Sequence, residues 1–240
     1  MLSLLLVMWS SQAPVPNAAP EPFCPPGWES LRNDACLLKG EQPGLVVYFH
    51  GMTAPSVKTL AWELSFPAKV PPSKRTSLVV LRGVAGLCDW ADEYRSWWCW
   101  PTARSRVPET QAVIDRLDDV VAAAGEKLHH QGLPVIAGYS NGGYLVSMLM
   151  GDPRVVASGW VVMHGGPITG VNYSKERERP TLLMAAIDDG IQRPAMEGLK
   201  AKLDGTNWKS ALVLRPGGHP PEVEDYQRLF DFAAQVSRSP

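Results

Sequence analysis

The chain has 240 residues, 45% of them hydrophobic and 20% charged, and its formal net charge is −1. This is the balance of a globular protein that can bury a core. Because the sequence has neither a basic stripe nor an acidic tail, nucleic acid is not expected among its partners.

The first 20 residues are typical of a targeting segment. An apolar stretch, Leu2–Trp9, is followed by a Pro/Ala-rich stretch that reaches Pro20. The apolar stretch is too short to span a bilayer but suits a secretion signal, although no Lys or Arg precedes it. We therefore expect residues 1–20 to be a secretion signal and linker, residues 21–240 to form a single domain, and no stable membrane insertion. The protein is then secreted or periplasmic, with a cytoplasmic location as the alternative.

The four cysteines fall into two local pairs, Cys24 with Cys36 and Cys88 with Cys99. More than one connectivity is formally possible, and we favour two local disulfides that close short loops. Reduced thiols in a cytosolic protein are the alternative. Since neither C-x-x-C nor H-x-x-x-H occurs, no zinc site is expected.

Short apolar runs rich in Val and Leu recur along the chain, with helix-like segments between them. The runs are 45–49, 77–81, 133–137, 160–163, 181–186 and 211–214. They do not alternate with polar residues, which is typical of strands buried on both faces of a parallel sheet. Residues 23–40 are expected to add a short antiparallel piece at one edge.

Three segments have helical periodicity. Ser56 is a candidate N-cap for a helix through Leu64. Apolar residues at three- and four-residue spacing predict a helix over 113–128, ended by Gly132, and another over 223–236. The alternation of strands and helices predicts an α/β fold, with a mostly parallel sheet covered by helices on both faces.

The segment Gly138–Gly142 reads Gly-Tyr-Ser-Asn-Gly, a G-x-S-x-G pattern between an apolar run and a helix-like segment at 143–150. Strand, sharp turn and helix in this order are the geometry of a nucleophile elbow, although the bare pattern also arises by chance in Gly-rich loops. Gly138 and Gly142 are the small residues that the turn needs, because a Cβ at either would collide with a neighbouring element. The helix N-terminus then points at the Ser140 hydroxyl, where backbone N–H groups can stabilise an oxyanion.

A serine nucleophile needs a base, and the base needs a group that orients it. After Ser140 the chain offers Asp188 and Asp189 behind the fifth run and His219 behind the last. The order Ser, Asp, His is that of the α/β-hydrolase fold. The sequence resembles an α/β-hydrolase from about residue 43 onward, most closely the small branch of carboxylesterases and polyester depolymerases. The resemblance rests on the His50-Gly51 turn, the elbow, the Asp188-Asp189 turn and the Gly218-His219 turn.

The resemblance implies a role for each matched residue. Ser140 attacks an acyl carbonyl, His219 moves the proton, and Asp189 orients His219, with Asp188 as the alternative acid. The oxyanion hole is formed by the backbone N–H groups of Asn141 and Met52. No metal and no cofactor are implied.

Several further residues are candidates for lining the substrate site. His50 and His164 each follow a strand, and Tyr139 precedes the serine. His50 is also expected to shape its turn. Four of the nine tryptophans lie in the segment Cys88–Trp100, and Trp90, Trp97 and Trp98 are candidates for a disulfide-bound wall that contacts substrate. The alternative is a small satellite core that holds a long loop.

The segment 167–179 is too short for a helical cap domain, so the site is expected to be open and to have no large lid. These features predict a serine esterase that acts on a small-molecule or polymer ester. A peptidase or thioesterase on the same fold is one alternative. A non-catalytic secreted protein that binds a ligand with the Trp-rich loop is the other.

Overall fold

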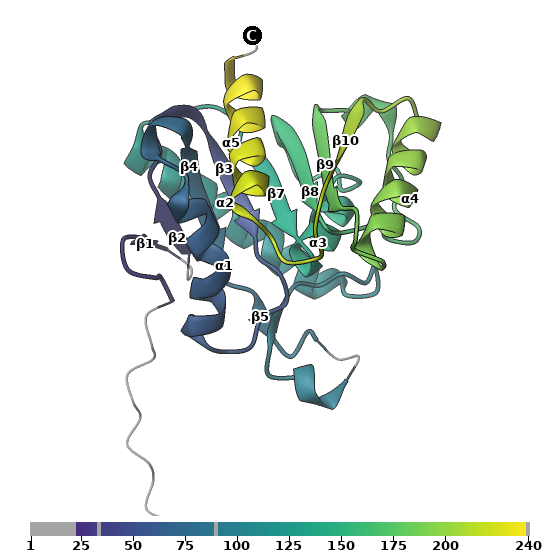
Figure 1. Cartoon of the computed structure of the whole chain (residues 1–240), viewed down its shortest axis with the longest axis horizontal. Helices are drawn as coiled ribbons and strands as arrows, with labels where there is room; N and C mark the ends of the chain where they lie inside the picture. Colours follow the sequence, from purple (N-terminus) through teal and green to yellow (C-terminus); the bar gives the residue numbers. More distant parts are fainter. Residues whose placement is uncertain (1–22, 33–34, 89–90, 239–240) are drawn as a thin grey trace, which may run out of the picture.

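A computed structural model describes residues 23–32, 35–88 and 91–238 of the chain (Figure 1). The predicted secretion signal at 1–20 and the candidate Trp90 lie outside the described residues. The strands are β1 (Glu29–Leu31), β2 (Ala35–Leu38), β3 (Gln42–Phe49), β4 (Thr76–Leu81), β5 (Val84–Ala85), β6 (Trp98–Cys99), β7 (Val135–Tyr139), β8 (Gly159–Met163), β9 (Thr181–Ala186) and β10 (Ser210–Arg215). The α-helices are α1 (Val57–Lys69), α2 (Val107–Leu128), α3 (Asn141–Leu149), α4 (Gln192–Gly205) and α5 (Val223–Arg238).

The described residues form an eight-stranded sheet with the order β1-β2-β4-β3-β7-β8-β9-β10. From β4 to β10 every neighbouring pair is parallel, whereas β1 and β2 form the antiparallel edge expected from residues 23–40. The α/β fold with a mostly parallel sheet is therefore confirmed.

The strands end in step at one edge of the sheet. Phe49 of β3 pairs with Gly138 of β7, and Tyr139 of β7 pairs with Met163 of β8. At the far side, Arg215 of β10 pairs with Ala186 of β9. The turns that follow these strands therefore begin beside one another, which is where parallel sheets place their sites.

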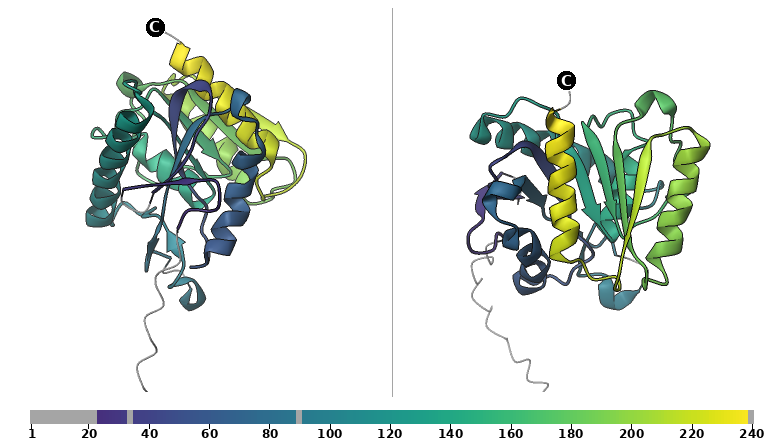
Figure 2. Two further views of the ribbon diagram at one scale, coloured as in Figure 1. Left: turned by 90° about the vertical axis from the view of Figure 1, so that its left-hand side faces the viewer. Right: turned by 45° about the horizontal axis from the view of Figure 1, so that its top comes forward.

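Helices cover both faces of the sheet. In the left view of Figure 2, α2 (teal) lies on one side of the sheet, and α1 (blue) and α5 (yellow) lie on the other. One core cluster joins the sheet to α2, α3 and α4, and a second joins it to α1 and α5. In β3 the residues Val47 and Phe49 belong to the first cluster, and Val46 and Tyr48 belong to the second. Both faces are thus apolar, which explains why the strands form continuous apolar runs.

The helices extend beyond their predicted bounds, since α1 continues to Lys69 and α2 begins at Val107 rather than at 113. Ser56 caps α1 as expected, with its side chain accepting a hydrogen bond from the Lys58 N–H at 3.2 Å. However, α2 ends at Leu128, and His129 takes the left-handed conformation (φ 53°) that Gly132 was expected to supply. A non-Gly residue is uncommon at this position but possible where the following chain is fixed. Here the His130 N–H donates a hydrogen bond to the Gly125 carbonyl. The helix α4 and the β5–β6 hairpin had no clear sequence signal.

The connection from β8 to β9 is short and holds only a 3₁₀ turn, Lys175–Arg177, so no cap domain interrupts the described chain there. Within the described residues, none of the helices combines the length and the apolar character that a bilayer crossing needs. The cysteines lie in the two local pairs expected from their spacing, with Cα–Cα distances of 5.4 Å for Cys24–Cys36 and 5.7 Å for Cys88–Cys99.

Helix α3 approaches β3 so closely that only glycine fits at their contact. A Cβ on Gly142 would lie 2.0 Å from the Phe49 carbonyl oxygen and 2.7 Å from that of His50. We expect Gly142→Ala to destabilise the protein by about 3 kcal/mol, because backbone cannot move aside as a flexible side chain can. The matched control is Gly198→Ala in α4, where a Cβ meets no atom within 4 Å. Its helix propensity should stabilise the protein by roughly 0.5–1 kcal/mol. Urea denaturation of both variants tests the packing, and equal stabilities would contradict it.

Candidate active site

Ser140 occupies the sharp turn between β7 and α3. Its backbone has φ 52° and ψ −116°, a conformation that a residue with a Cβ rarely adopts. The turn is held on both sides, because the Ser140 N–H donates to the Met163 carbonyl at 2.8 Å and the Ser140 carbonyl accepts from the Tyr144 N–H at 3.0 Å. The strained serine is therefore fixed by its neighbours.

The side chains of Ser140, His219 and Asp189, which follow three different strands, form one hydrogen-bonded series. The His219 Nε2 lies 3.0 Å from the Ser140 Oγ, and the His219 Nδ1 lies 2.8 Å from Oδ2 of Asp189. A carboxylate only accepts, so the Nδ1 of His219 carries the proton and its Nε2 is left to accept from the serine hydroxyl. The arrangement can therefore remove a proton from Ser140 and hold it on His219.

Asp189, rather than its neighbour, is the carboxylate that contacts His219. It is buried at the entrance to α4, and its Oδ1 accepts from the Gln192 N–H at 3.0 Å. Burial raises the pKa of Asp189, but hydrogen bonds from Gln192, His219 and His164 outweigh it and hold the pKa below its usual range. Asp188 is exposed, and its carboxylate accepts from the Gly217 N–H at 3.3 Å. It steadies the turn that leads to His219.

The two expected oxyanion donors lie in the turns after β3 and β7. Asn141 is the first residue of α3, so its N–H has no partner inside the helix, and Met52 is half-buried in the turn after β3. Neither backbone N–H has an acceptor within the described part of the chain. The Asn141 side chain is engaged instead, because its Oδ1 accepts from the Trp100 N–H at 2.8 Å. Both N–H groups are thus free to bind a developing oxyanion.

The turn after β3 is supported from below by a buried carboxyl group. Glu63 of α1 is 4% exposed, and both of its oxygens lie 3.2 Å from the Gly51 N–H. The Tyr48 hydroxyl donates to the same carboxyl group at 2.7 Å and lies 2.8 Å from the Tyr226 hydroxyl. Burial raises the pKa of Glu63 to about 7, and these hydrogen bonds offset only part of the effect.

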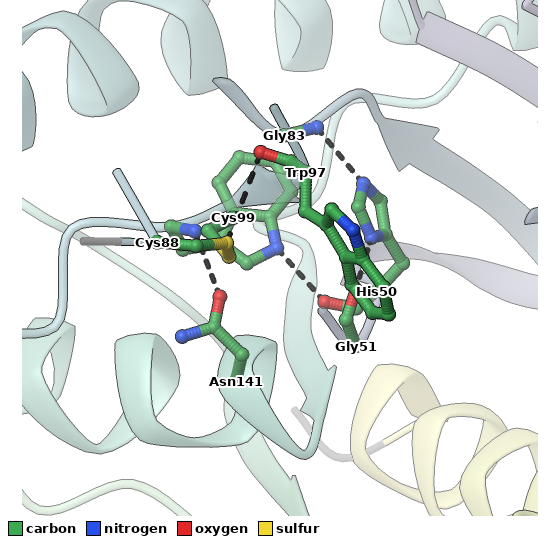
Figure 3. Close-up of a disulfide and its surroundings, with 8 residues drawn as sticks. His50, Gly51, Gly83, Cys88, Trp97, Cys99 and Asn141 are labelled. Carbon is green, nitrogen blue, oxygen red and sulfur yellow. Dashed lines mark hydrogen bonds between the residues drawn. A yellow bond between two sulfur atoms is a disulfide. The ribbon is translucent and has the colours of Figure 1, made fainter. Parts of the chain in front are cut away.

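His50 supports the same turn from inside and does not line the substrate site. It is fully buried, and its Nε2 accepts from the Gly83 N–H at 2.9 Å (Figure 3). Since Nε2 is the acceptor, Nδ1 carries the proton and donates to the Gly51 carbonyl at 2.5 Å. Burial lowers the pKa of His50 to about 4, so the side chain is neutral at pH 7.

Trp100 joins the turns after β3 and β7 to the Cys88–Cys99 disulfide, and Figure 3 shows this disulfide near Asn141 and His50. The Trp100 backbone N–H donates to Asn141, as above, and its indole Nε1–H donates to the His50 carbonyl at 2.8 Å. Cys99 immediately precedes it, and the Cys88 sulfur lies 3.8 Å from the Trp97 carbonyl oxygen. The disulfide-closed loop is therefore connected by hydrogen bonds to the turn that carries Ser140.

The remaining candidate lining residues divide into buried and half-buried ones. Tyr139 and His164 are buried, so they support the site rather than line it. The Tyr139 hydroxyl donates to the His219 carbonyl at 3.0 Å. Trp97 and Trp98 are half-buried, and Trp98 packs against Phe23 with ring centroids 6.0 Å apart. The Trp-rich segment thus combines a small satellite core with surfaces that remain open to solvent.

Arg215 is a site residue that the sequence analysis missed. It is buried at the end of β10, where its Nε lies 2.9 and 3.0 Å from the two carboxylate oxygens of Asp225. Its guanidinium also donates to the carbonyls of Pro216, Gly218 and Pro220, which belong to the loop that carries His219. The only sequence signal for this role was an arginine directly after an apolar run, and an arginine in that position is usually exposed to solvent.

His164, Asp189 and His219 also form the kind of set that can bind a metal ion, because their ligand atoms lie within 4.8 Å of one another. The nitrogens of both histidines, however, contact one carboxylate oxygen at 3.1 and 2.8 Å. Atoms around a tetrahedral ion with bonds of about 2.0–2.1 Å lie roughly 3.3 Å apart. We therefore assign the set to N–H···O hydrogen bonds.

No protein-family model matches the chain, and no curated protein matches its sequence. Solved structures do resemble it. A carboxylesterase from Mesorhizobium loti has 19% identity and a TM-score of 0.61 over 87% of this chain and 99% of its own. The Bacillus cereus carboxylesterase has 15% identity and a TM-score of 0.61 over 84% and 93%. SOBER1 from Arabidopsis thaliana has 13% identity and a TM-score of 0.59 over 80% and 98%.

The ionisation of Glu63 predicts a pH dependence of stability. Because its folded-state pKa is raised, the folded protein keeps a proton that the unfolded chain releases between about pH 4.5 and 7, so stability falls as the pH rises through this window. Glu63→Gln resembles the protonated form and should lose this dependence. Across this pH window, the free energy of unfolding of the wild-type protein should fall by on the order of 3 kcal/mol relative to that of the variant. Urea denaturation at several pH values measures the difference, with Glu126→Gln on the exposed face of α2 as the control. Parallel curves for wild type and Glu63→Gln would contradict the prediction.

Proposed function

We propose that this protein, whose chain has the α/β-hydrolase fold, is a serine hydrolase that cleaves carboxylic esters through an acyl-enzyme intermediate. The observation that carries the proposal is the hydrogen-bonded series Ser140–His219–Asp189 at the carboxyl edge of the sheet. The fold is the one that the sequence resemblance implied. Carboxylesterases are among the solved structures that share it, which supports the choice of reaction.

In the first half of the reaction, the Nε2 of His219 takes the Ser140 proton as Oγ attacks the acyl carbonyl. The carbonyl oxygen becomes an oxyanion, which the N–H groups of Asn141 and Met52 bind. The protonated His219 then gives its proton to the departing alcohol oxygen, and the acyl group stays on Ser140. Asp189, held ionised by its hydrogen bonds, stabilises the imidazolium.

In the second half, a water molecule replaces the alcohol. His219 removes its proton, the resulting hydroxide attacks the acyl carbon, and the same two N–H groups bind the second oxyanion. The bond to the Ser140 Oγ breaks, Oγ takes the proton back from His219, and the carboxylic acid leaves. Every step uses groups of the chain and water, and we propose no cofactor.

The surroundings of Ser140 favour an accessible ester. The side chain of His219 is 38% exposed, and the β8–β9 connection, all of whose residues the structure describes, holds no cap domain. Trp97 and Trp98 offer aromatic surface on the disulfide-closed loop. We propose small-molecule esters or ester groups of a polymer as substrates. Two disulfides fit a secreted or periplasmic protein, with residues 1–20 as its signal and 21–240 as one domain.

Replacing the nucleophile tests the proposal directly. We expect Ser140→Ala to lower kcat by at least about 10⁴-fold on any ester that the wild type cleaves, without loss of folding. A fluorophosphonate should label wild type at Ser140, located by peptide mass mapping, and should not label the variant. Ser73→Ala is the control, because Ser73 is exposed in the turn before β4, away from the carboxyl ends of the strands.

The same experiment separates the alternatives. Full ester turnover by Ser140→Ala would contradict the proposal, and an unlabelled but folded wild type would favour the ligand-binding protein. Comparison of kcat/KM on matched ester, thioester and peptide substrates then distinguishes esterase from thioesterase or peptidase.

The two disulfides should differ in their effect on turnover. Replacing Cys88 and Cys99 by serine frees Trp100, so we expect kcat to fall by about tenfold or more as the oxyanion donors lose their position. Replacing Cys24 and Cys36 by serine should lower stability by roughly 3 kcal/mol and leave kcat unchanged. Steady-state kinetics and urea denaturation of both double variants measure this. Equal effects on kcat would contradict the link between the loop and the oxyanion hole.

A further inference from the structure

His164 is a buried histidine that the proposed reaction does not use. It follows β8, is 0% exposed, and has a left-handed backbone with φ 49°. Its N–H donates to the Met184 carbonyl at 2.8 Å, so the neighbouring strand holds the strained residue in place. A left-handed non-Gly residue at a strand end costs free energy, and such strain is concentrated at functional sites.

The partners of His164 fix its tautomer. Arg215 can only donate, and its Nη2 lies 3.4 Å from the His164 Nε2, which must therefore accept. The proton then resides on Nδ1, which lies 3.1 Å from the Oδ2 of Asp189. Burial is the main cause that lowers the pKa of His164 and keeps the ring neutral. The residue is thus a neutral donor aimed at the triad acid.

The two histidines share one acceptor atom. The Oδ2 of Asp189 accepts from His219 at 2.8 Å and from His164 at 3.1 Å, and the two rings meet edge to face with centroids 5.5 Å apart. A carboxylate oxygen that accepts two hydrogen bonds is a weaker acceptor for each donor than an oxygen that accepts only one. His164 therefore acts on the oxygen that binds the base.

We propose that His164 is a positioning residue that locks the Asp189 carboxylate and weakens its hold on the His219 proton. The inference rests on the proposed serine hydrolase function. A triad with His164 should therefore stay active down to a lower pH than one without it. Arg215, which is held by its ion pair with Asp225 of α5, sets the tautomer of His164. The hydrogen-bond network therefore extends to α5.

Charged and titratable groups reach this cluster from several elements. Asp189 comes from the turn after β9, and His219 from the loop before α5. Arg215 of β10 is paired with Asp225 and also with Glu222 at 3.0 Å. The Tyr139 ring of β7 lies 5.8 Å from the His164 ring. The Asp189 charge contributes to raising the pKa of Tyr144 of α3. Burial raises the pKa of both tyrosines, so they stay neutral across the pH range of the test.

Two substitutions separate the hydrogen bond from the shape of the ring. His164→Phe keeps a ring but removes the donor, whereas His164→Asn places an amide N–H close to the position of Nδ1. In His164→Phe the undivided Asp189 charge should bind the His219 proton more tightly. The acid limb of the kcat/KM profile should then move up by about one pH unit, and kcat should fall by about tenfold. In His164→Asn the limb should stay within about 0.3 unit of wild type.

The proposal is overturned if His164→Phe folds and keeps the wild-type acid limb, or if both variants shift the limb equally. A purely structural role would change stability in both variants without moving the limb. The pH dependence of fluorophosphonate labelling at Ser140 gives a second profile that does not depend on the choice of substrate.

A measurement on the wild-type protein covers the case in which His164→Phe does not fold. In assigned ¹⁵N NMR spectra at about pH 8, where the ring is neutral, His164 should be the Nδ1–H tautomer. An Nε2–H tautomer at His164 would overturn the proposal. Failure of the proposed function is distinguishable, because it would appear as unlabelled Ser140 in wild type at every pH, whatever the tautomer of His164.

Discussion

A buried carboxylate is the constraint around which this structure is arranged. Asp189 is 6% exposed, and an ionised carboxylate at such a place is stable only if donors replace the water it has lost. The start of α4, the loop before α5 and the end of β8 each supply one donor, from Gln192, His219 and His164. Three segments far apart in the sequence therefore converge on one side chain. The His219 imidazole that faces Ser140 is oriented as a result of this convergence.

The turn after β3, which carries the proposed oxyanion donor Met52, depends on a different set of supports. Backbone N–H groups can stabilise an oxyanion only if their positions are fixed before the reaction, because reorientation costs free energy. Glu63 binds the Gly51 N–H from α1, and His50 bridges to the Gly83 N–H beside β4. Trp100 then connects this turn to Asn141 through the disulfide-closed loop. Glu63, His50 and Trp100 are buried and hydrogen-bonded to this backbone, which makes them supports of a rigid turn.

Much of the fold could be predicted from residue pattern alone. Apolar runs buried on both faces gave the central strands to within a few residues, because such runs have few alternatives in an α/β fold. Gly138 and Gly142 around Ser140 indicated the elbow, since a Cβ on either would collide where α3 approaches β7 and β3. The helix α4 escaped prediction because its apolar face is narrow, with Met196, Leu199 and Leu203 as its buried apolar contacts. His129 shows that a local glycine signal can be overridden where the following chain is held.

The sequence by itself determined the parallel sheet and the Ser-Asp-His order, because these depend on periodicity, turn chemistry and chain order, whereas it only favoured the local pairing of the cysteines. Only the tertiary structure decided which side chains meet. It brought His164 into contact with the Asp189 carboxylate and Arg215 into contact with the loop that carries His219. It also buried His50 and Tyr139 next to the site. The physical reason is that a hydrogen bond or a desolvated charge requires atoms within about 3 Å. Residues separated by 25 or 51 positions in the chain, as His164 is from Asp189 and from Arg215, acquire that distance only through the register of the sheet.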